Sequence, residues 1–453
     1  MKKITVGEIE QAIGGRLLCG DRETTALEIC TDSRKAQGGA AFFALIGENL
    51  DAHDFLEQVA QKGCAIAIVS QEVMLIENTI LVPDTTKALQ DLAKWYLSTF
   101  DIKKIGITGS TGKTTTKDMM YYILSEKYKT GRNIGNFNNL IGLPLTALSF
   151  EEGTEVAVFE MGTDHLGEIH TLAEIVKPNI GIITNIGISH IQTIGSREKI
   201  LQAKLEITDF FSETDTLIIN EENDLLTREA ALGNYKLITV GNNGKSNYII
   251  SDISDFGENG IEFTLEHEHH AQRFKLPIPG RHNAYNGAVA VAAAALLGVS
   301  MEEAAKGLSK MILTEKRLSI KGKDGIKVID DTYNASPPAV KAAIDVLIAT
   351  RGMRKVAVLG DMLGLGEGSE KYHEEVGEYA AKCGVDLVIG IGEETKFIAE
   401  AAEKSLGKNQ VKYFETKDEF FKKMGTIIAR GDVILVKGSR GMAMEQVVKK
   451  ILE

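Results

Sequence analysis

Apolar runs separated by helical stretches recur along the chain, and their pattern divides it into three parts. In the first part, residues 1–100, the short runs 40–46 and 65–69 have the composition of buried strands, with helical periodicity between them. The stretch 84–100 has the spacing of an amphipathic helix and ends where the pattern changes, near residue 101. We therefore expect a small α/β domain over residues 1–100.

The second part, residues 101–313, repeats the order strand, glycine turn, helix. Its strand-like runs are apolar on both faces, as strands of a parallel sheet are. Alternation of apolar and polar residues from 248 to 279 predicts an antiparallel extension, and an alanine-rich helix (284–297) follows and stops at Gly298. We expect a central α/β domain. The parallel-type runs are residues 105–108, 156–159 and 180–183.

The third part, residues 314–453, alternates five apolar runs with helical stretches. This alternation predicts a doubly wound, Rossmann-like α/β domain. The runs are residues 326–329, 356–359, 387–389, 411–414 and 433–436.

A glycine-rich turn joins the first strand of the central part to its first helix, predicted over 116–128. Glycines let backbone N–H groups approach phosphate oxygens, and the helix N-terminus adds partial positive charge. Its lysine can reach the terminal phosphates, and the threonine after it can ligate Mg²⁺. The strict phosphate-loop motif would need glycine at position 107, which is isoleucine, so the loop is a variant. A turn that binds nothing is the alternative, but the flanking strand and helix favour a P-loop-type mononucleotide-binding domain. The turn is Thr108-Gly109-Ser110-Thr111-Gly112-Lys113-Thr114-Thr115.

Three polar side chains lie near the ends of predicted central elements. Glu160 ends a strand, where a carboxylate can hold Mg²⁺ or can simply be solvated. His190 follows the next strand and is either a metal ligand or a structural hydrogen-bonding group. Lys204 lies on a predicted helix, where a lysine is usually an exposed charge.

Composition narrows the class of protein. The net charge of −12 argues against a nucleic-acid groove, which is normally basic. No apolar run reaches the roughly 18–20 residues of a membrane span, so we expect no membrane insertion. The N-terminus lacks the features of a secretory signal, and the four cysteines are scattered, which together predict a reducing, cytoplasmic location.

The spelling of the glycine-rich turn resembles the ATP loop of the Mur ligase superfamily, which also includes folylpolyglutamate synthetase and cyanophycin synthetase. The resemblance implies ATP and two Mg²⁺ ions, with Lys113, Glu160, His190 and Lys204 as catalytic residues. It implies Thr114, Glu160, His190 and a carbamylated Lys204 at the metals. Carbamylation requires a neutral amine, hence a partly buried lysine. The other implied nucleotide contacts are Asn283, Asn286, Arg317 and Asp331.

The resemblance covers nearly the whole chain and is closest to the branch that joins D-alanyl-D-alanine to UDP-N-acetylmuramoyl-tripeptide. The D-N-P-R stretch of the branch that adds diaminopimelate is absent from the sequence. One departure is Gly364, where many members of the matching branch have glutamate. The residues that the resemblance places near these substrates are Ser33, Arg34, Gly47, Asp51, His53, Asn136, Asn138, Asn139, Asn334 and Asp361.

The implied reaction is phosphorylation of a carboxylate, followed by attack of an amine on the acyl phosphate. A ligase that adds a single amino acid, a folate- or cyanophycin-type ligase, and a non-catalytic nucleotide-binding regulator are the alternatives. Local alternatives also stand: Asn283 as a helix cap, and Ser336 as a cap before Pro337. The histidine-rich stretch 266–270 is interpreted as a solvated hairpin tip rather than a metal site.

Overall fold

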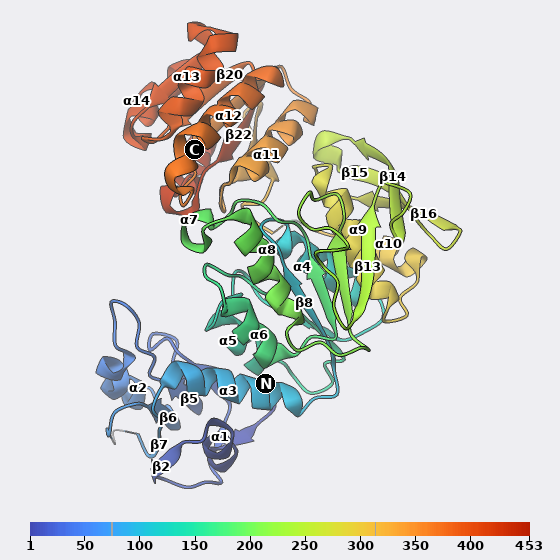
Figure 1. The fold of residues 1–453 in the computed structure, drawn as a ribbon. Helices are drawn as coiled ribbons and strands as arrows, with labels where there is room; N and C mark the ends of the chain where they lie inside the picture. The colour runs from blue at the N-terminus through green and yellow to red at the C-terminus, as the bar shows by residue number, and fades with distance from the viewer. Residues whose placement is uncertain (74–75, 313) are drawn as a thin grey trace.

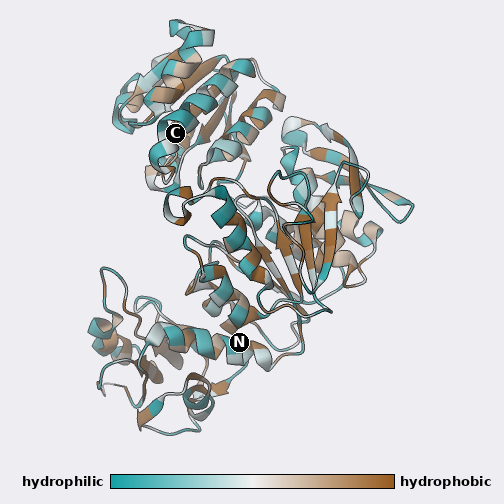
Figure 2. Ribbon diagram, in the orientation of Figure 1, coloured by the Kyte–Doolittle hydropathy of each residue, from teal (hydrophilic) through white to brown (hydrophobic). Residues whose placement is uncertain are grey.

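The computed structural model describes residues 1–73, 76–312 and 314–453, and its mixed α/β fold consists of three sheet-centred units stacked in chain order (Figure 1). Apolar strands form the interior of the central and C-terminal units, and hydrophilic residues are frequent on the helices outside them (Figure 2). The predicted boundary at residue 313 falls on a position outside the described residues.

The N-terminal unit contains a five-stranded sheet in the order β2-β7-β6-β5-β4 and a two-stranded β1-β3 pair. The predicted helix is α3 (Thr85–Ser98), and the Asp84 carboxylate caps it by accepting from the Thr86 and Lys87 N–H groups at 2.7 and 3.0 Å. The two predicted strands are confirmed as β5 and β6. The elements are β1 (Ile4–Thr5), α1 (Val6–Ile13), β2 (Arg16–Cys19), β3 (Thr25–Ala26), β4 (Glu28–Cys30), β5 (Ala40–Phe43), α2 (Leu56–Gln61), β6 (Ile66–Val69) and β7 (Asn78–Leu81).

The central unit contains a nine-stranded sheet in the order β16-β15-β14-β13-β12-β11-β8-β10-β9. Strands β8 to β14 pair in parallel, and β14, β15 and β16 form the predicted antiparallel extension. The strands are β8 (Lys103–Thr108), β9 (Thr130–Arg132), β10 (Val156–Glu160), β11 (Ile180–Ile183), β12 (Thr216–Asn220), β13 (Lys236–Gly241), β14 (Tyr248–Asp255), β15 (Ile261–His267) and β16 (His270–Leu276).

Helix α4 (Lys113–Leu124) begins directly at the glycine-rich turn, three residues before the predicted start, and packs against α9 (His282–Ala295). Small side chains on α9 are almost all buried, which allows this close packing. The tip between β15 and β16 confirms the predicted hairpin. The remaining central helices are α5 (Gly142–Leu148), α6 (Glu168–Val176), α7 (Ile191–Ile194), α8 (Arg197–Leu205) and α10 (Met301–Ser309).

The C-terminal unit contains a six-stranded sheet in the order β17-β18-β22-β19-β20-β21. The five predicted strands form its parallel part, and β17 is an additional antiparallel edge strand. Ser336 precedes α11 as predicted, but its side chain makes no capping hydrogen bond. The elements are β17 (Ser319–Lys323), β18 (Ile326–Asp331), α11 (Pro337–Ala349), β19 (Arg354–Gly360), α12 (Ser369–Lys382), β20 (Leu387–Ile391), α13 (Thr395–Leu406), β21 (Val411–Phe414), α14 (Lys417–Ile427), β22 (Asp432–Lys437) and α15 (Glu445–Leu452).

The two joints between the units differ in chemistry. At the first joint, α3 packs against α5 and α6, and one hydrophobic core continues from the N-terminal unit into the central unit. At the second joint, the short 3-10 helix η3 (Gly257–Asn259) contacts α11, and the Lys327 ammonium pairs with the Glu258 carboxylate at 2.6 Å. No helix in the described parts of the chain is long and apolar enough to cross a membrane.

Candidate active site

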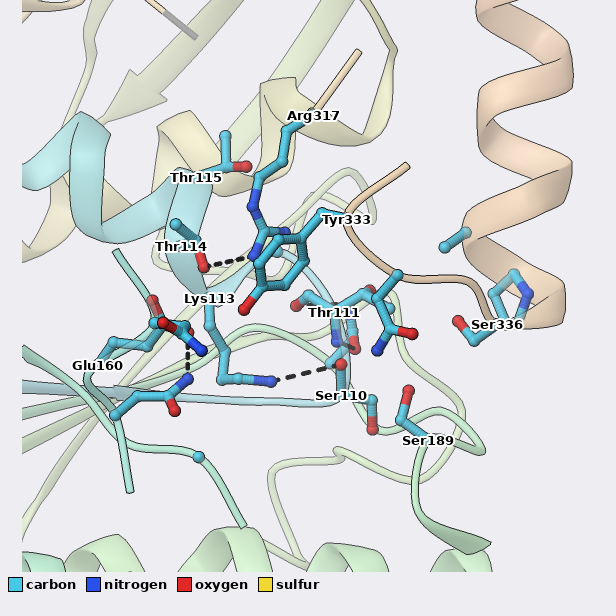
Figure 3. Close-up of a pocket in the computed structure, with 18 of the residues that line it drawn as sticks. Ser110, Thr111, Lys113, Thr114, Thr115, Glu160, Ser189, Arg317, Tyr333 and Ser336 are labelled. Atoms are coloured by element: carbon cyan, nitrogen blue, oxygen red, sulfur yellow. Dashed lines mark hydrogen bonds between the residues drawn. The ribbon is translucent and has the colours of Figure 1, made fainter. Parts of the chain in front are cut away.

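A cavity of about 680 Å³ lies where the carboxyl ends of the central strands face the C-terminal unit (Figure 3). Ligands bind at this edge in open α/β sheets. The cavity brings together most of the residues predicted to contact nucleotide or metal, from segments as far apart in the sequence as Ser110 and Asn334. The predicted residues that line it are Ser110, Thr111, Gly112, Lys113, Thr114, Thr115, Asn136, Asn138, Asn139, Glu160, His190, Asn283, Asn286, Arg317, Asp331 and Asn334.

The glycine-rich turn wraps the N-terminus of α4. Gly112 has a φ of 82° and immediately precedes the helix, and an added Cβ there would approach the Asn286 side chain to 2.8 Å. The Lys113 ammonium lies in the cavity and donates to the Gly109 carbonyl at 2.7 Å and, more weakly, to the Ser110 carbonyl at 3.4 Å, the bond drawn in Figure 3. Burial lowers the pKa of Lys113, and the nearby Glu160 carboxylate opposes that shift. The lysine is thus held beside the space that a triphosphate would occupy.

Two residues of the predicted loop do not line the cavity. Thr108 is fully buried, and its hydroxyl donates to the Met161 carbonyl at 2.9 Å, so this side chain stabilises the strand instead of facing a nucleotide. Gly109 lies against Thr184, where an added Cβ would come within 2.0 Å of the hydroxyl oxygen. Glycine at this position allows the two chain segments to approach closely.

Glu160 ends β10 and is 2% exposed. Its Oε1 accepts from the Asn138 side-chain N–H at 2.8 Å, whereas its Oε2 is buried and has no hydrogen-bond partner within the described residues. The Lys117 ammonium lies 3.8 Å from Oε2. Because a buried carboxylate oxygen without a partner is costly, this atom fits a divalent cation.

Other oxygens would have to complete such a site. Across residues 1–73, 76–312 and 314–453, no group of three or more His, Cys, Asp or Glu side chains is arranged to hold a metal. Mg²⁺ commonly retains several waters and binds one or two protein ligands together with substrate phosphates. The single free carboxylate oxygen of Glu160 is compatible with that mode of binding.

His190 lines the cavity, whereas Lys204 does not, although the two groups are close enough for their charges to interact. The His190 Nδ1 lies 2.7 Å from the Asp164 carboxylate, which orients the ring and leaves Nε2 available. Burial lowers the pKa of His190, against the opposing effect of Asp164, and so favours the neutral ring that a metal ligand requires. Lys204 is buried in α8 rather than exposed, and burial moves its pKa well below the ordinary value. The low pKa is the condition for carbamylation.

Arg317 enters the cavity from the segment that precedes β17. Its Nη2 donates to the Thr114 hydroxyl at 2.9 Å, and its guanidinium lies 4.0 Å from the centre of the Tyr333 ring (Figure 3). The flanking residues Lys316 and Leu318 have φ values of 63° and 53°, in the left-handed region. A bent segment therefore directs the arginine across the second joint.

Asp331 fixes this segment from the end of β18. Its carboxylate accepts from the Leu318 N–H at 3.2 Å and from the Lys437 ammonium at 2.5 Å. Lys437 is 3% exposed and also donates to the Asn334 carbonyl at 2.8 Å. Asp331 and Asn334 both line the cavity, and the hydrogen bonds from Lys437 hold them together.

The interpretation of Asn283 as a helix cap is wrong. Helix α9 begins at His282 with Arg281 in the cap position, so Asn283 lies inside the first turn. Its side chain donates to the Pro279 carbonyl at 2.7 Å, and the Asn286 side chain donates to it at 3.1 Å. The two asparagines form a fixed polar wall of the cavity.

The predicted substrate residues of the N-terminal unit do not line this cavity. His53 is almost fully buried, with Nδ1 2.6 Å from the Asp51 carboxylate and Nε2 accepting from the Ser70 N–H. Exposed Arg34 forms a two-point pair with Asp32, and its hydrogen bonds lower the pKa of Asp32 to about 2. His53 therefore organises a loop. The other residues in this group are Ser33 and Gly47.

Asp361 also lies outside the cavity. Its carboxylate accepts from the Glu394 and Thr395 N–H groups at the start of α13, and burial raises its pKa. Nearby Gly364 has a φ of 77°, and an added Cβ would meet no atom within 4 Å. The departure at position 364 thus places glycine where the backbone favours it.

Several residues of the site were not identified from the sequence. Lys117 lies one helical turn after Lys113, a spacing that signals a shared helix face. Tyr333 lies between two identified residues, Asp331 and Asn334. Asp164 follows β10 without a local pattern that marks it. Only the folded arrangement reveals its contact with the imidazole of His190.

Comparison with known proteins is consistent with this geometry. Residues 107–294 match the Mur ligase middle domain, and residues 316–440 match the Mur ligase glutamate ligase domain. The chain is 41% identical to the UDP-N-acetylmuramoyl-tripeptide–D-alanyl-D-alanine ligase of Bacillus subtilis (strain 168), with 100% of this chain and 99% of the relative covered. It is 33% identical to the ligase of the same name from Escherichia coli (strain K12), with the same coverage.

Solved structures agree with the sequence relatives. A crystal structure of MurF from Acinetobacter baumannii has a TM-score of 0.92 and 34% identity, covering 100% of this chain and 99% of that chain. MurF from Thermotoga maritima in complex with ADP has a TM-score of 0.83 and 27% identity, covering 93% and 96%. The chain therefore belongs to the Mur ligase family, among the UDP-N-acetylmuramoyl-tripeptide–D-alanyl-D-alanine ligases.

Proposed function

We propose that this protein joins D-alanyl-D-alanine to UDP-N-acetylmuramoyl-tripeptide, with conversion of ATP to ADP and phosphate. The product is UDP-N-acetylmuramoyl-pentapeptide, a peptidoglycan precursor. The observation that carries the proposal is the cavity in which Lys113, Glu160 and Arg317 converge from separate segments. The full-length relatives that bear this ligase name supply the substrates.

ATP is proposed to bind with its phosphates at the start of α4. Backbone N–H groups of the turn and the helix dipole favour phosphate there. Lys113 needs only to leave the Gly109 carbonyl to reach the terminal phosphates. Asn283 and Asn286 on one wall, with Asp331 on the other, are proposed to hold the nucleoside.

We further propose that Thr114 and Glu160 hold one Mg²⁺, and that His190 and carbamylated Lys204 help to hold a second. When bound, these ions would neutralise charge on the transferring phosphoryl group. Asp164 orients His190 for this role. Glu160 contributes its Oε2, which accepts no hydrogen bond from any residue that the structure describes.

The chemistry requires two steps. The terminal carboxylate of the tripeptide attacks the γ-phosphorus, forming an acyl phosphate and releasing ADP. The dipeptide amine then attacks the acyl carbon, loses a proton, and expels phosphate as the amide bond forms. Lys113 and Arg317 stabilise negative charge on the phosphoryl oxygens, so no side-chain nucleophile is needed.

The proposed substrate contacts are spread over all three units, taken as residues 1–100, 101–313 and 314–453. Ser33, Arg34 and Gly47 on the N-terminal unit, together with the Asp51–His53 loop, are proposed to hold the UDP group. The asparagine-rich loop at 136–139 is proposed to contact the muramoyl peptide, and Asn334 and Asp361 are proposed as further substrate contacts. Because ATP is supplied in the cytoplasm, we expect the enzyme to work there.

Incubation with ATP, Mg²⁺ and UDP-N-acetylmuramoyl-tripeptide tests the proposal when acceptors are varied. We expect pentapeptide product with D-alanyl-D-alanine and no product with single amino acids, as measured by mass spectrometry. Product with a single amino acid would instead support the rival ligase. Phosphate release that does not depend on any acceptor would support a nucleotide-binding regulator.

Two substitutions test the site itself. Lys113→Ala and Glu160→Gln should each abolish turnover, because one removes the phosphate-binding cation and the other removes a metal-binding charge. Lys408→Ala, in an exposed turn of the C-terminal unit, is the matched control. Near-normal rates in either site variant would contradict the assignment.

A further inference from the structure

The asparagine-rich loop (136–139) and the preceding Asn133 are hydrogen-bonded to the end of β10. The Glu160 N–H donates to the Asn133 side chain at 2.6 Å, and the Gly162 N–H donates to the Asn138 carbonyl at 2.8 Å. The Asn138 side chain then reaches the Glu160 carboxylate at 2.8 Å. The loop is thus bound to both the backbone and the side chain of the proposed metal ligand.

The three asparagines of this loop have different surroundings. Asn139 holds the turn that leads into α5, because its side-chain oxygen accepts from the Ile141 and Gly142 N–H groups at 3.2 and 2.7 Å. Asn136 is exposed and lines the cavity. Asn138 also lines the cavity but directs its amide to Glu160. The sequence resemblance places all three near the substrates, but their hydrogen bonds differ, so they do not share one role.

The bond from Asn138 determines which carboxylate oxygen of Glu160 remains available. It occupies Oε1 and leaves Oε2 buried and without a hydrogen-bond partner among the described residues. Lys117 cannot replace this bond, because its ammonium lies 3.8 Å away and on the side of Oε2. A carboxylate with one oxygen fixed presents the other in a defined direction.

We propose that Asn138 is a positioning residue that holds the Glu160 carboxylate so that Oε2 faces the divalent cation. This inference rests on the proposed function, since it assumes that Glu160 is a metal ligand. Residues that hold metal ligands typically change metal affinity about 10- to 100-fold when removed. Asn138 acts through Glu160 and need not touch the ion.

The test is a titration of Mn²⁺ against the intact protein with ADP present, followed by electron paramagnetic resonance. Asn138→Ala should weaken Mn²⁺ binding about tenfold. Ile134→Ala, at an exposed side chain just before the same loop, should leave Mn²⁺ affinity within twofold of the native value. Thermal melting checks folding, and Asn138→Ser, whose hydroxyl is too short to reach Glu160, replaces the alanine variant if that variant does not fold.

A double-mutant cycle separates positioning from general loosening of the loop. In a Glu160→Ala background, Asn138→Ala should cause no further loss of Mn²⁺ affinity, because the residue through which it acts is absent. Equal losses in both backgrounds, or native affinity in Asn138→Ala, would overturn the inference. The readout is metal binding alone, so failure of amide formation in the ligase assay would be a separate result.

Discussion

The two joints of this molecule connect neighbouring units by different means. At the first joint, Tyr96 of α3 is fully buried, and its hydroxyl donates to the Phe150 carbonyl at 2.7 Å within a continuous apolar core. At the second joint, Ile188 joins the C-terminal core, and the other contacts are largely polar, such as Arg317 to Thr114. An apolar joint resists separation, whereas a polar joint can exchange its partners for water.

The proposed reaction takes place at the polar joint and not at the apolar one. The cavity lies across the second joint and includes residues from both of its sides. Closure there would exclude water from an acyl phosphate, and opening would release products. The first joint instead joins the N-terminal unit, which we propose binds the UDP group, to the central unit through a continuous apolar core.

The largest expected effect is at the second joint. Arg317→Ala should lower kcat by about 10³-fold, because an arginine that stabilises a transferring phosphoryl group has an effect of that order. The melting temperature should remain close to native, since the guanidinium is only partly buried. Stopped assays for ADP and calorimetry measure the two quantities, and a loss below tenfold would weaken the functional contrast between the joints.

Stability should be most sensitive at the first joint. Tyr96→Ala should reduce the free energy of unfolding by about 3–5 kcal/mol, because it leaves a cavity and removes a buried hydroxyl. Urea unfolding measures this change, with Tyr413→Ala as a control at a residue that is 40% exposed. The kcat of folded enzyme should change little, and a large loss of kcat would show that the first joint also moves.

A smaller effect is expected for the ion pair at the second joint. Replacing Lys327 with methionine and Glu258 with glutamine should reveal a coupling energy of about 0.5–1 kcal/mol, because both side chains are partly exposed. Small-angle scattering should show a broader distribution of separations between units. A coupling energy above about 3 kcal/mol would indicate a rigid joint.

The smallest effect concerns the ion pair between Lys316 and Glu445, which holds the segment that carries Arg317. Partial burial raises the pKa of Glu445, but hydrogen bonds from Lys316 and Arg440 outweigh burial and lower the pKa to about 2. Since the folded pKa is below its ordinary value of 4.5, the stabilisation exists above pH 4.5 and is lost as the pH falls toward 2. Because solvent screens this partly exposed group, we expect the free energy of unfolding to fall by at most about 0.5 kcal/mol.

Urea unfolding at pH 5 and pH 3 measures this loss. Glu445→Gln should reduce the difference in unfolding free energy between the two pH values. If the difference in unfolding free energy is unchanged, the pairing of Lys316 with this carboxylate does not hold the segment that carries Arg317.

Sequence patterns predicted the strands, helices and turns that are specified by neighbouring residues in the chain. The five parallel strands of the C-terminal sheet and helix α3 follow from periodicity and are confirmed, as is the hairpin tip expected within residues 266–270. Strand β17 was missed, because its sequence Ser319–Lys323 has little apolar alternation and pairs only through its neighbour β18. A polar edge strand is specified by its partner more than by its own residues.

The site shows the same limit. The glycine-rich turn is recognisable because its function resides in consecutive residues, and Glu160 because it ends a strand. The contact of Asn138 with Glu160 and that of Asp164 with His190 connect segments 22 and 26 positions apart in the sequence. Such pairs arise from the approach of loops at the sheet edge, which no local pattern encodes.

The left-handed backbone on both sides of Arg317 has an energetic consequence. Two non-glycine residues in this region together cost about 2–4 kcal/mol. A charge-assisted hydrogen bond and ring stacking return a similar amount, about 2–4 kcal/mol. The contacts of Arg317 with Thr114 and Tyr333 therefore offset about as much free energy as the backbone of its two neighbours costs.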